Sequence, residues 1–137
     1  MVEFWINYSA WLRHGPSKVW SPLVSLIRLT LIEADANRLI SAATVLEAGL
    51  AIEARYGSAG GRELDLLVAK ASLSIEAVTA QQAEVAREAW RRYGKGRHAA
   101  GLNFGDCFSY ALARVTGEPL LFKGDDFTHT DITPVAY

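Results

Sequence analysis

Three aspartates stand beside the predicted ends of secondary-structure elements, where side chains are well placed for chemistry. Asp106 is the third residue of a predicted helix capped by Asn103, and Asp125 and Asp126 follow a short apolar strand. Ligands of open α/β sheets gather beyond the carboxyl ends of the strands, and hard carboxylate oxygens suit Mg²⁺ or Mn²⁺. The three aspartates therefore suggest a divalent-cation site.

Glu47 is a fourth acidic residue that needs an explanation. A carboxylate on a largely apolar helix stripe is costly unless it is paired, binds a metal or reaches water. Glu47 is therefore either a further metal ligand or an edge residue whose head is solvated. Its helical neighbours at three and four positions are Ala43, Thr44, Leu50 and Ala51.

The aspartates also have simpler explanations. An acid at the third helical position, such as Asp106, interacts favourably with free backbone amides and with the helix dipole. Asp125 and Asp126 follow Gly124, and Gly-Asp sequences are common in solvated turns. Each aspartate is ambiguous alone, so the metal hypothesis rests on their joint placement.

A basic segment, RRYGKGRHAAG at residues 91–101, precedes Asp106. Backbone amides of a glycine-rich loop and flexible cations can cradle phosphate. The alternative is an ordinary solvated loop, as most short basic runs are. Beside an acidic cluster, the segment would supply what a nucleic-acid hydrolase needs. Its candidate phosphate contacts are Arg91, Arg92, Lys95 and Arg97.

Predicted helices and strands alternate along the chain, which favours an α/β fold with a mainly parallel central sheet flanked by helices. Strands are predicted at residues 2–8, 38–40, 73–78 and 120–123. Helices are predicted at 23–34, 42 to about 56, 62–70 and 81–92, and from the Asn103 cap to Gly117. Ser41 is the expected cap of the second helix, and residues 57–61 are expected to form a turn.

Length and composition predict one globular domain spanning residues 1–137, and the net charge of −1 offers no overall attraction to nucleic acid. A lone cysteine, Cys107, excludes an intramolecular disulfide. The sequence has no apolar run of membrane-spanning length and no signal-peptide pattern at its N-terminus. We therefore expect a cytoplasmic protein without membrane association.

Two segments of the chain resemble the PIN-domain ribonucleases, specifically the VapC-type toxins of bacterial type II toxin–antitoxin pairs. The similarity is carried by RLISAATVLEAGLAIEARYG at 38–57 and by YGKGRHAAGLNFGDCFSYALARVTGEPLLFKGDDFTHTDI at 93–132. Within the second segment, the NFGDCFSYALA and LLFKGDDF strings are the most specific. The resemblance covers roughly the last hundred residues.

The resemblance implies a PIN-like fold and a metal-dependent endoribonuclease that uses Mg²⁺ or Mn²⁺. Glu47 and Asp106 match metal-binding acids of the family, while the last acidic position is either Asp125 or Asp126. The implied partners are RNA and a cognate VapB-like antitoxin expected to cover the acidic residues. Such families also commonly form homodimers.

The N-terminal segment, residues 1–30, departs from the family pattern. The family's first strand normally ends in a metal-binding aspartate, and the best counterpart here is the neutral Asn7. An amide oxygen can ligate a metal but lacks the charge that attracts a divalent cation. The competing hypothesis is therefore a catalytically impaired PIN-fold module that binds antitoxin or RNA. A third class, an unrelated phosphate-binding protein, is not supported by any Walker or dinucleotide loop.

Overall fold

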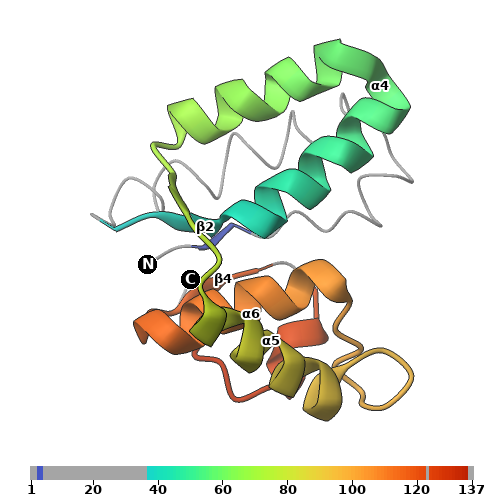
Figure 1. Ribbon diagram of the computed structural model, residues 1–137, viewed down its shortest axis with the longest axis vertical. Helices are drawn as coiled ribbons and strands as arrows, with labels where there is room; N and C mark the ends of the chain where they lie inside the picture. The colour runs from blue at the N-terminus through green and yellow to red at the C-terminus, as the bar shows by residue number, and fades with distance from the viewer. Residues whose placement is uncertain (1–2, 5–36, 123, 136–137) are drawn as a thin grey trace.

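The computed structural model describes residues 3–4, 37–122 and 124–135. Predicted strand 2–8 overlaps these residues only at 3–4, whereas predicted helix 23–34 and Asn7 lie outside them. Figure 1 shows the order of the elements. They are β1 (Glu3–Phe4), β2 (Leu39–Ser41), α4 (Ala42–Lys70), β3 (Ser74–Glu76), α5 (Ala80–Tyr93), α6 (Phe104–Thr116), β4 (Leu120–Leu121) and the 3₁₀ helix η1 (Asp126–His129).

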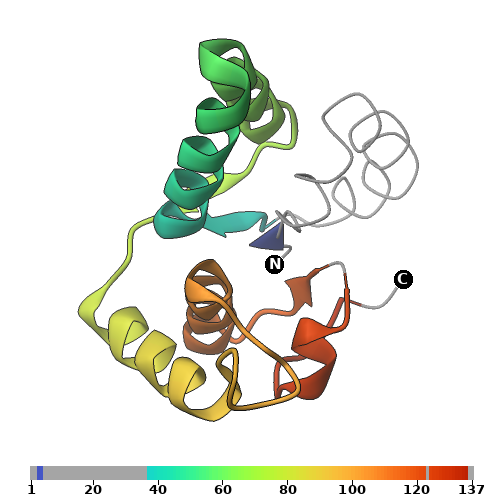
Figure 2. The ribbon, with the colours of Figure 1, turned by 90° about the vertical axis from the view of Figure 1, so that its right-hand side faces the viewer.

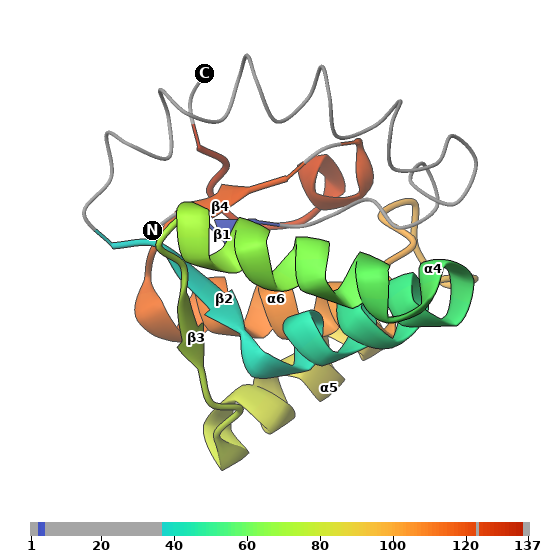
Figure 3. The same cartoon turned by 90° about the horizontal axis from the view of Figure 1, so that it is seen from above.

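The strands form parallel pairs, which confirms the α/β prediction. β2 pairs with β3, with Ile40 opposite Ile75, and β1 pairs with β4, with Phe4 opposite Leu121. β1 also contacts β2, and Figure 3 shows the strands following one another in the order β3, β2, β1, β4. Parallel neighbours require crossover connections, and α4 is the connection between β2 and β3.

Helix α4 begins as predicted, and a kink interrupts it where the first predicted helix was expected to end. The Ser41 side chain accepts a hydrogen bond from the Ala43 backbone N–H at 3.3 Å, which caps the first turn. Gly57 alone leaves the helical conformation, with a φ of 63°. The first predicted helix therefore ends at Gly57 as expected, whereas the turn expected over residues 57–61 is confined to Gly57, because helical conformation resumes directly after it. Figure 1 shows the two arms of α4 folding back on each other.

The glycines after the kink serve packing between the arms. A Cβ on Gly60 would lie 2.8 Å from the Ile52 side chain, too close for an ordinary contact. The absent side chain lets the arms approach, and Ile52 and Leu64 are buried together between them. Glycine thus permits close approach here rather than a turn.

Helix α6 lies at the centre of the molecule. It packs against α5 on one side and contacts α4, β2 and β4 on others, as Figure 2 shows for the helices. Gly117 ends it in the left-handed conformation, with a φ of 75°, as predicted. The largest apolar cluster forms around it and includes Leu102, Leu112, Leu120 and Phe127, each at most 1% exposed. Among the described helices, none is both long and apolar enough to cross a membrane.

Candidate metal centre

Asp106 occupies the third position of α6, and its carboxylate is locked by the helix cap. The Asn103 backbone N–H donates to Asp106 Oδ2 at 2.8 Å, and the Asp106 N–H donates to Asn103 Oδ1 at 3.0 Å. This reciprocal capping box satisfies two amides that the helix itself leaves free. The predicted Asn103 cap is confirmed, and it fixes the direction of the carboxylate.

The second carboxylate oxygen of Asp106 has no hydrogen-bond partner among the described residues. Asp106 is 0% exposed, and its Oδ1 atom is buried and unpaired. Burial raises the pKa of Asp106 to about 7; the Asn103 hydrogen bond opposes this, and the charges of Asp126 and Glu47 add to it. A helix cap explains only Oδ2. A buried carboxylate oxygen without a donor is what a bound cation would complete.

Glu47 reaches Asp106's helix from the first arm of α4. Glu47 is an exposed residue, but its carboxylate lies directly against Gly105 of α6. Desolvation there raises the pKa of Glu47. The same two helices are joined by a buried hydrogen bond of 3.3 Å between the Thr44 and Ser109 hydroxyls. Glu47 therefore lies at the edge of its helix face, as the solvated-edge interpretation expected. Its carboxylate, however, is directed at α6 rather than away from it.

The structure distinguishes between the two neighbouring aspartates after β4. Asp125 is exposed, whereas Asp126 is half-buried in the first turn of η1. Burial and the adjacent Asp125 charge raise the pKa of Asp126, while His129 opposes the rise. The charge of Asp126 also raises the pKa of Asp106, whereas the charge of Asp125 is not among the causes of that shift. Asp126 is thus the member of the pair that is electrostatically coupled to Asp106.

Glu47 and Asp126 come from separate elements, and the charge of each acts on Asp106, but the three acids do not form a closed cage. Within the part of the chain that the structure describes, no three carboxylate, imidazole or thiol side chains converge closely enough to hold a metal ion. Asn7, the expected fourth member, lies outside that part. The described acids are therefore an open, coupled group centred on the unpaired oxygen of Asp106.

The basic segment is attached by its backbone to the start of α6. The Lys95 N–H donates to the Leu102 carbonyl at 3.0 Å, and the Leu102 N–H donates to the Tyr93 carbonyl at 2.9 Å. This closes the loop directly before the Asn103 cap. Lys95 and Arg97 are exposed on the loop. Figure 3 shows the loop, η1 and the start of α6 at the same end of the molecule.

The cations of this segment differ in what they already contact. Arg92 forms an ion pair of 3.7 Å with Asp131 and lies over the Tyr93 ring, and Arg97 lies 5.9 Å from the centre of the Trp90 ring. Arg91 is exposed at the end of α5. Arg92 therefore already contacts the C-terminal segment through Asp131, an interaction that the sequence did not indicate.

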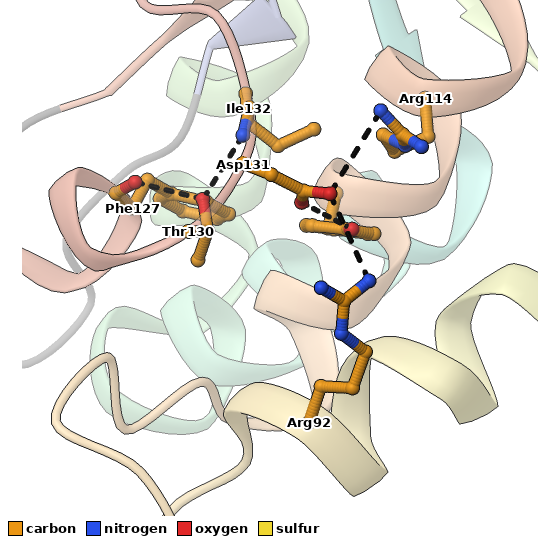
Figure 4. A network of polar contacts seen from close by, with 7 residues as sticks. Arg92, Arg114, Phe127, Thr130, Asp131 and Ile132 are labelled. Carbon is orange, nitrogen blue, oxygen red and sulfur yellow. Dashed lines mark hydrogen bonds and ion pairs between the residues drawn. The ribbon is translucent and has the colours of Figure 1, made fainter.

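Asp131 is the centre of a polar network that sequence reasoning missed. Tyr110 donates its hydroxyl proton to Asp131 Oδ1 at 2.6 Å, and Arg92 and Arg114 approach Asp131 Oδ2 at 3.7 and 3.9 Å (Figure 4). The Tyr110 hydrogen bond is the main reason that the pKa of Asp131 is lowered. The network ties the segment after η1 to α5 and α6. An isolated aspartate among threonines carries no sequence signal for this role.

Phe104 is a second residue near the acids that the sequence did not single out. It is the first residue of α6 and 67% exposed, with its ring packed edge-to-face on Phe108 at 5.0 Å. A large exposed aromatic ring is more informative than an exposed aliphatic side chain. Phe104 lies at the exposed N-terminal end of α6, two residues before Asp106 in the sequence, and residues two apart face different sides of a helix.

Comparison with known proteins identifies the family to which the chain is related. The PIN domain family matches residues 21–132. Ribonuclease VapC30 of Mycobacterium tuberculosis is 62% identical over 105 residues, covering 77% of this chain and 80% of that protein. Ribonuclease VapC of Mycolicibacterium smegmatis is 59% identical over 101 residues, covering 74% and 78%. Ribonuclease VapC42 of Mycobacterium tuberculosis is 49% identical over 104 residues, covering 75% and 79%.

Proposed function

Since this chain belongs to the PIN-domain family, among the VapC ribonucleases, we propose that it is a metal-dependent endoribonuclease and the toxin of a type II toxin–antitoxin pair. The observation that carries the proposal is the buried, unpaired Oδ1 of Asp106, coupled to Glu47 and Asp126. Buried polar atoms without a partner are uncommon in folded proteins, and a bound ion is one of the recognised explanations for them.

The donor set fits a hard divalent cation, Mg²⁺ or Mn²⁺. Asp106 and Glu47 would hold the ion, Asp126 would complete the acidic group, and Asp125 would act through water. Asn7 would offer a neutral amide oxygen. When bound, the ion activates water and stabilises charge on the scissile phosphate and leaving oxygen.

The protein's own contribution is orientation. Asn103 holds one oxygen of Asp106 and leaves the other free to ligate. Burial of Asp106 excludes water from one side of the site, so its charge acts in a medium of low dielectric.

RNA phosphates would be bound by the basic segment beside these acids. Lys95 and Arg97 on the loop, with Arg91 at the end of α5, are the best candidates because their side chains are exposed. Arg92 is a weaker candidate, since Asp131 already pairs with it. The exposed ring of Phe104 is suited to stacking on an unpaired base.

The remaining features follow from the same proposal. The protein partner is a VapB-like antitoxin that covers the acidic residues, the toxin self-associates as a homodimer, and the complex works in the cytoplasm. The chain from 1 to 137 acts as a single PIN-like domain with an atypical segment at 1–30.

The alternative function is a PIN-fold module that binds antitoxin or RNA and hydrolyses poorly. The observation that favours it is Asn7, a neutral residue where the family pattern has an aspartate. Asn7→Asp restores the charge, so it should raise Mn²⁺ affinity and activity together if the missing charge limits the enzyme.

Cleavage of a panel of structured RNAs by the purified full chain tests the proposal. Mg²⁺ and Mn²⁺ should support cleavage, EDTA should abolish it, and Asp106→Asn should remove it without unfolding the protein. Cleavage that survives in Asp106→Asn would come from a contaminant or another site and would refute the assigned centre. No cleavage by wild type, with recovery in Asn7→Asp, would establish the impaired module instead.

A further inference from the structure

Gly105 is the point at which α6 receives the carboxylate of Glu47. It is buried, and a Cβ built on it would overlap Glu47 Oε2, with the carboxyl carbon only 2.7 Å away. We propose that Gly105 is a positioning residue of the metal centre, because its missing side chain lets Glu47 lie beside Asp106. This inference rests on the proposed metal-dependent function.

The backbone does not explain a glycine at this position. Gly105 is the second residue of a regular helix and is not among the glycines with positive φ, unlike Gly117. In a helix alanine is favoured over glycine. The feature that requires glycine is therefore the close approach of Glu47 from α4.

A methyl group at this position should move Glu47 rather than disrupt the fold. The overlapping atoms are at the far end of the flexible side chain of an exposed residue, which can swing into solvent. The helices would stay connected through Thr44 and Ser109, whose hydroxyls are 3.3 Å apart in the interior. The carboxylate would leave Asp106 while α4 and α6 keep their places.

Gly105→Ala and Gly49→Ala form a matched pair for testing this role. A Cβ on Gly49, two residues beyond Glu47 in α4, would meet only Leu64 Cδ2 at 3.8 Å, an ordinary contact. Both full-length variants are titrated with Mn²⁺, and free Mn²⁺ is measured by electron paramagnetic resonance. We expect about 10-fold weaker binding in Gly105→Ala, the loss typical of disturbing a group that supports a metal site. Gly49→Ala should bind as the wild type does, and both variants should keep their helical circular dichroism.

Repeating the Gly105→Ala substitution in a Glu47→Ala background separates positioning from a general effect on α6. If Gly105 acts by admitting Glu47, the substitution should cause no further loss of Mn²⁺ affinity there. Unchanged affinity in the single variant, or an equal loss in both backgrounds, would overturn the inference. Wild type that binds Mn²⁺ without cleaving RNA would refute the nuclease proposal alone. Wild type that binds no Mn²⁺ would refute the centre and the role of Gly105 together.

Discussion

Replacing Asp106 with asparagine should remove a destabilisation of the metal-free protein that grows as pH rises toward 8. Burial raises the pKa of Asp106 from 3.8 to about 7. At 1.36 kcal/mol per pH unit, an ionised Asp106 therefore costs the folded chain about 4 kcal/mol relative to its protonated form. Asparagine carries no charge and keeps an oxygen for the Asn103 N–H.

The pH dependence follows from the sign of this shift. Because the folded-state pKa is the higher one, the stability contributed by protonated Asp106 is complete below pH 3.8 and is lost as pH rises through about 7. Between pH 5 and pH 8 the wild type should lose about 3 kcal/mol relative to Asp106→Asn. The new amide nitrogen without an acceptor adds a pH-independent cost of about 1–3 kcal/mol to the variant. The pH slope of the difference, rather than its absolute value, is the prediction.

Urea unfolding of both proteins in EDTA, from pH 5 to pH 8, measures this slope. Asp65→Asn removes an exposed carboxylate and controls for the change in net charge. The reasoning would be refuted if the difference in free energy of unfolding between wild type and Asp106→Asn did not change with pH. It would also be refuted if the wild type became more stable relative to the variant as pH rises. Adding Mn²⁺ at pH 8 should stabilise the wild type and leave Asp106→Asn unchanged, since binding to the folded state alone raises stability.

Two further substitutions test the contacts that hold α6. Ser109→Ala should lower the free energy of unfolding, measured in urea, by about 1–3 kcal/mol because it leaves the buried Thr44 hydroxyl unpaired. Adding Thr44→Val should recover part of that loss. Strictly additive losses would show that the two hydroxyls do not interact. Tyr110→Phe should cost about 1.5 kcal/mol, the low end for a bond to a charged group because Asp131 is partly exposed. It should also raise the pKa of Asp131, and an unchanged carboxyl titration by NMR would contradict the assigned hydrogen bond.

Local patterns predicted much of the fold because their causes are local. Asn103 followed three residues later by Asp106 is a capping signature, and the structure contains both of its hydrogen bonds. Ser41 and Gly117 likewise mark helix ends where expected. The glycine-rich stretch after Gly57 misled the prediction, because glycine favours a turn and equally permits two helix arms to touch.

The candidate site was predictable in residue type but not in geometry. The acidic character of Glu47, Asp106 and Asp126 suggests a cation, yet burial of Asp106 depends on α6 lying between α5 and the other elements. The contact of Glu47 with Gly105 joins residues far apart in sequence, so no spacing rule reveals it. The ion pair between Arg92 and Asp131 also depends on the tertiary structure, so the sequence does not reveal it. The assigned roles of these residues stay predictions.

The closed base of the basic loop bears on how such an enzyme can diversify. The two ends of the loop are joined through backbone atoms of Tyr93, Lys95 and Leu102, and these bonds need no particular side chain, provided that the donor positions 95 and 102 are not proline. Lys95, Arg97 and their neighbours can therefore be exchanged without altering where α6 begins. Under the proposed function, RNA contacts and the metal-binding acids would lie on adjacent but separable segments, so the loop could diverge in evolution while the acidic group is retained.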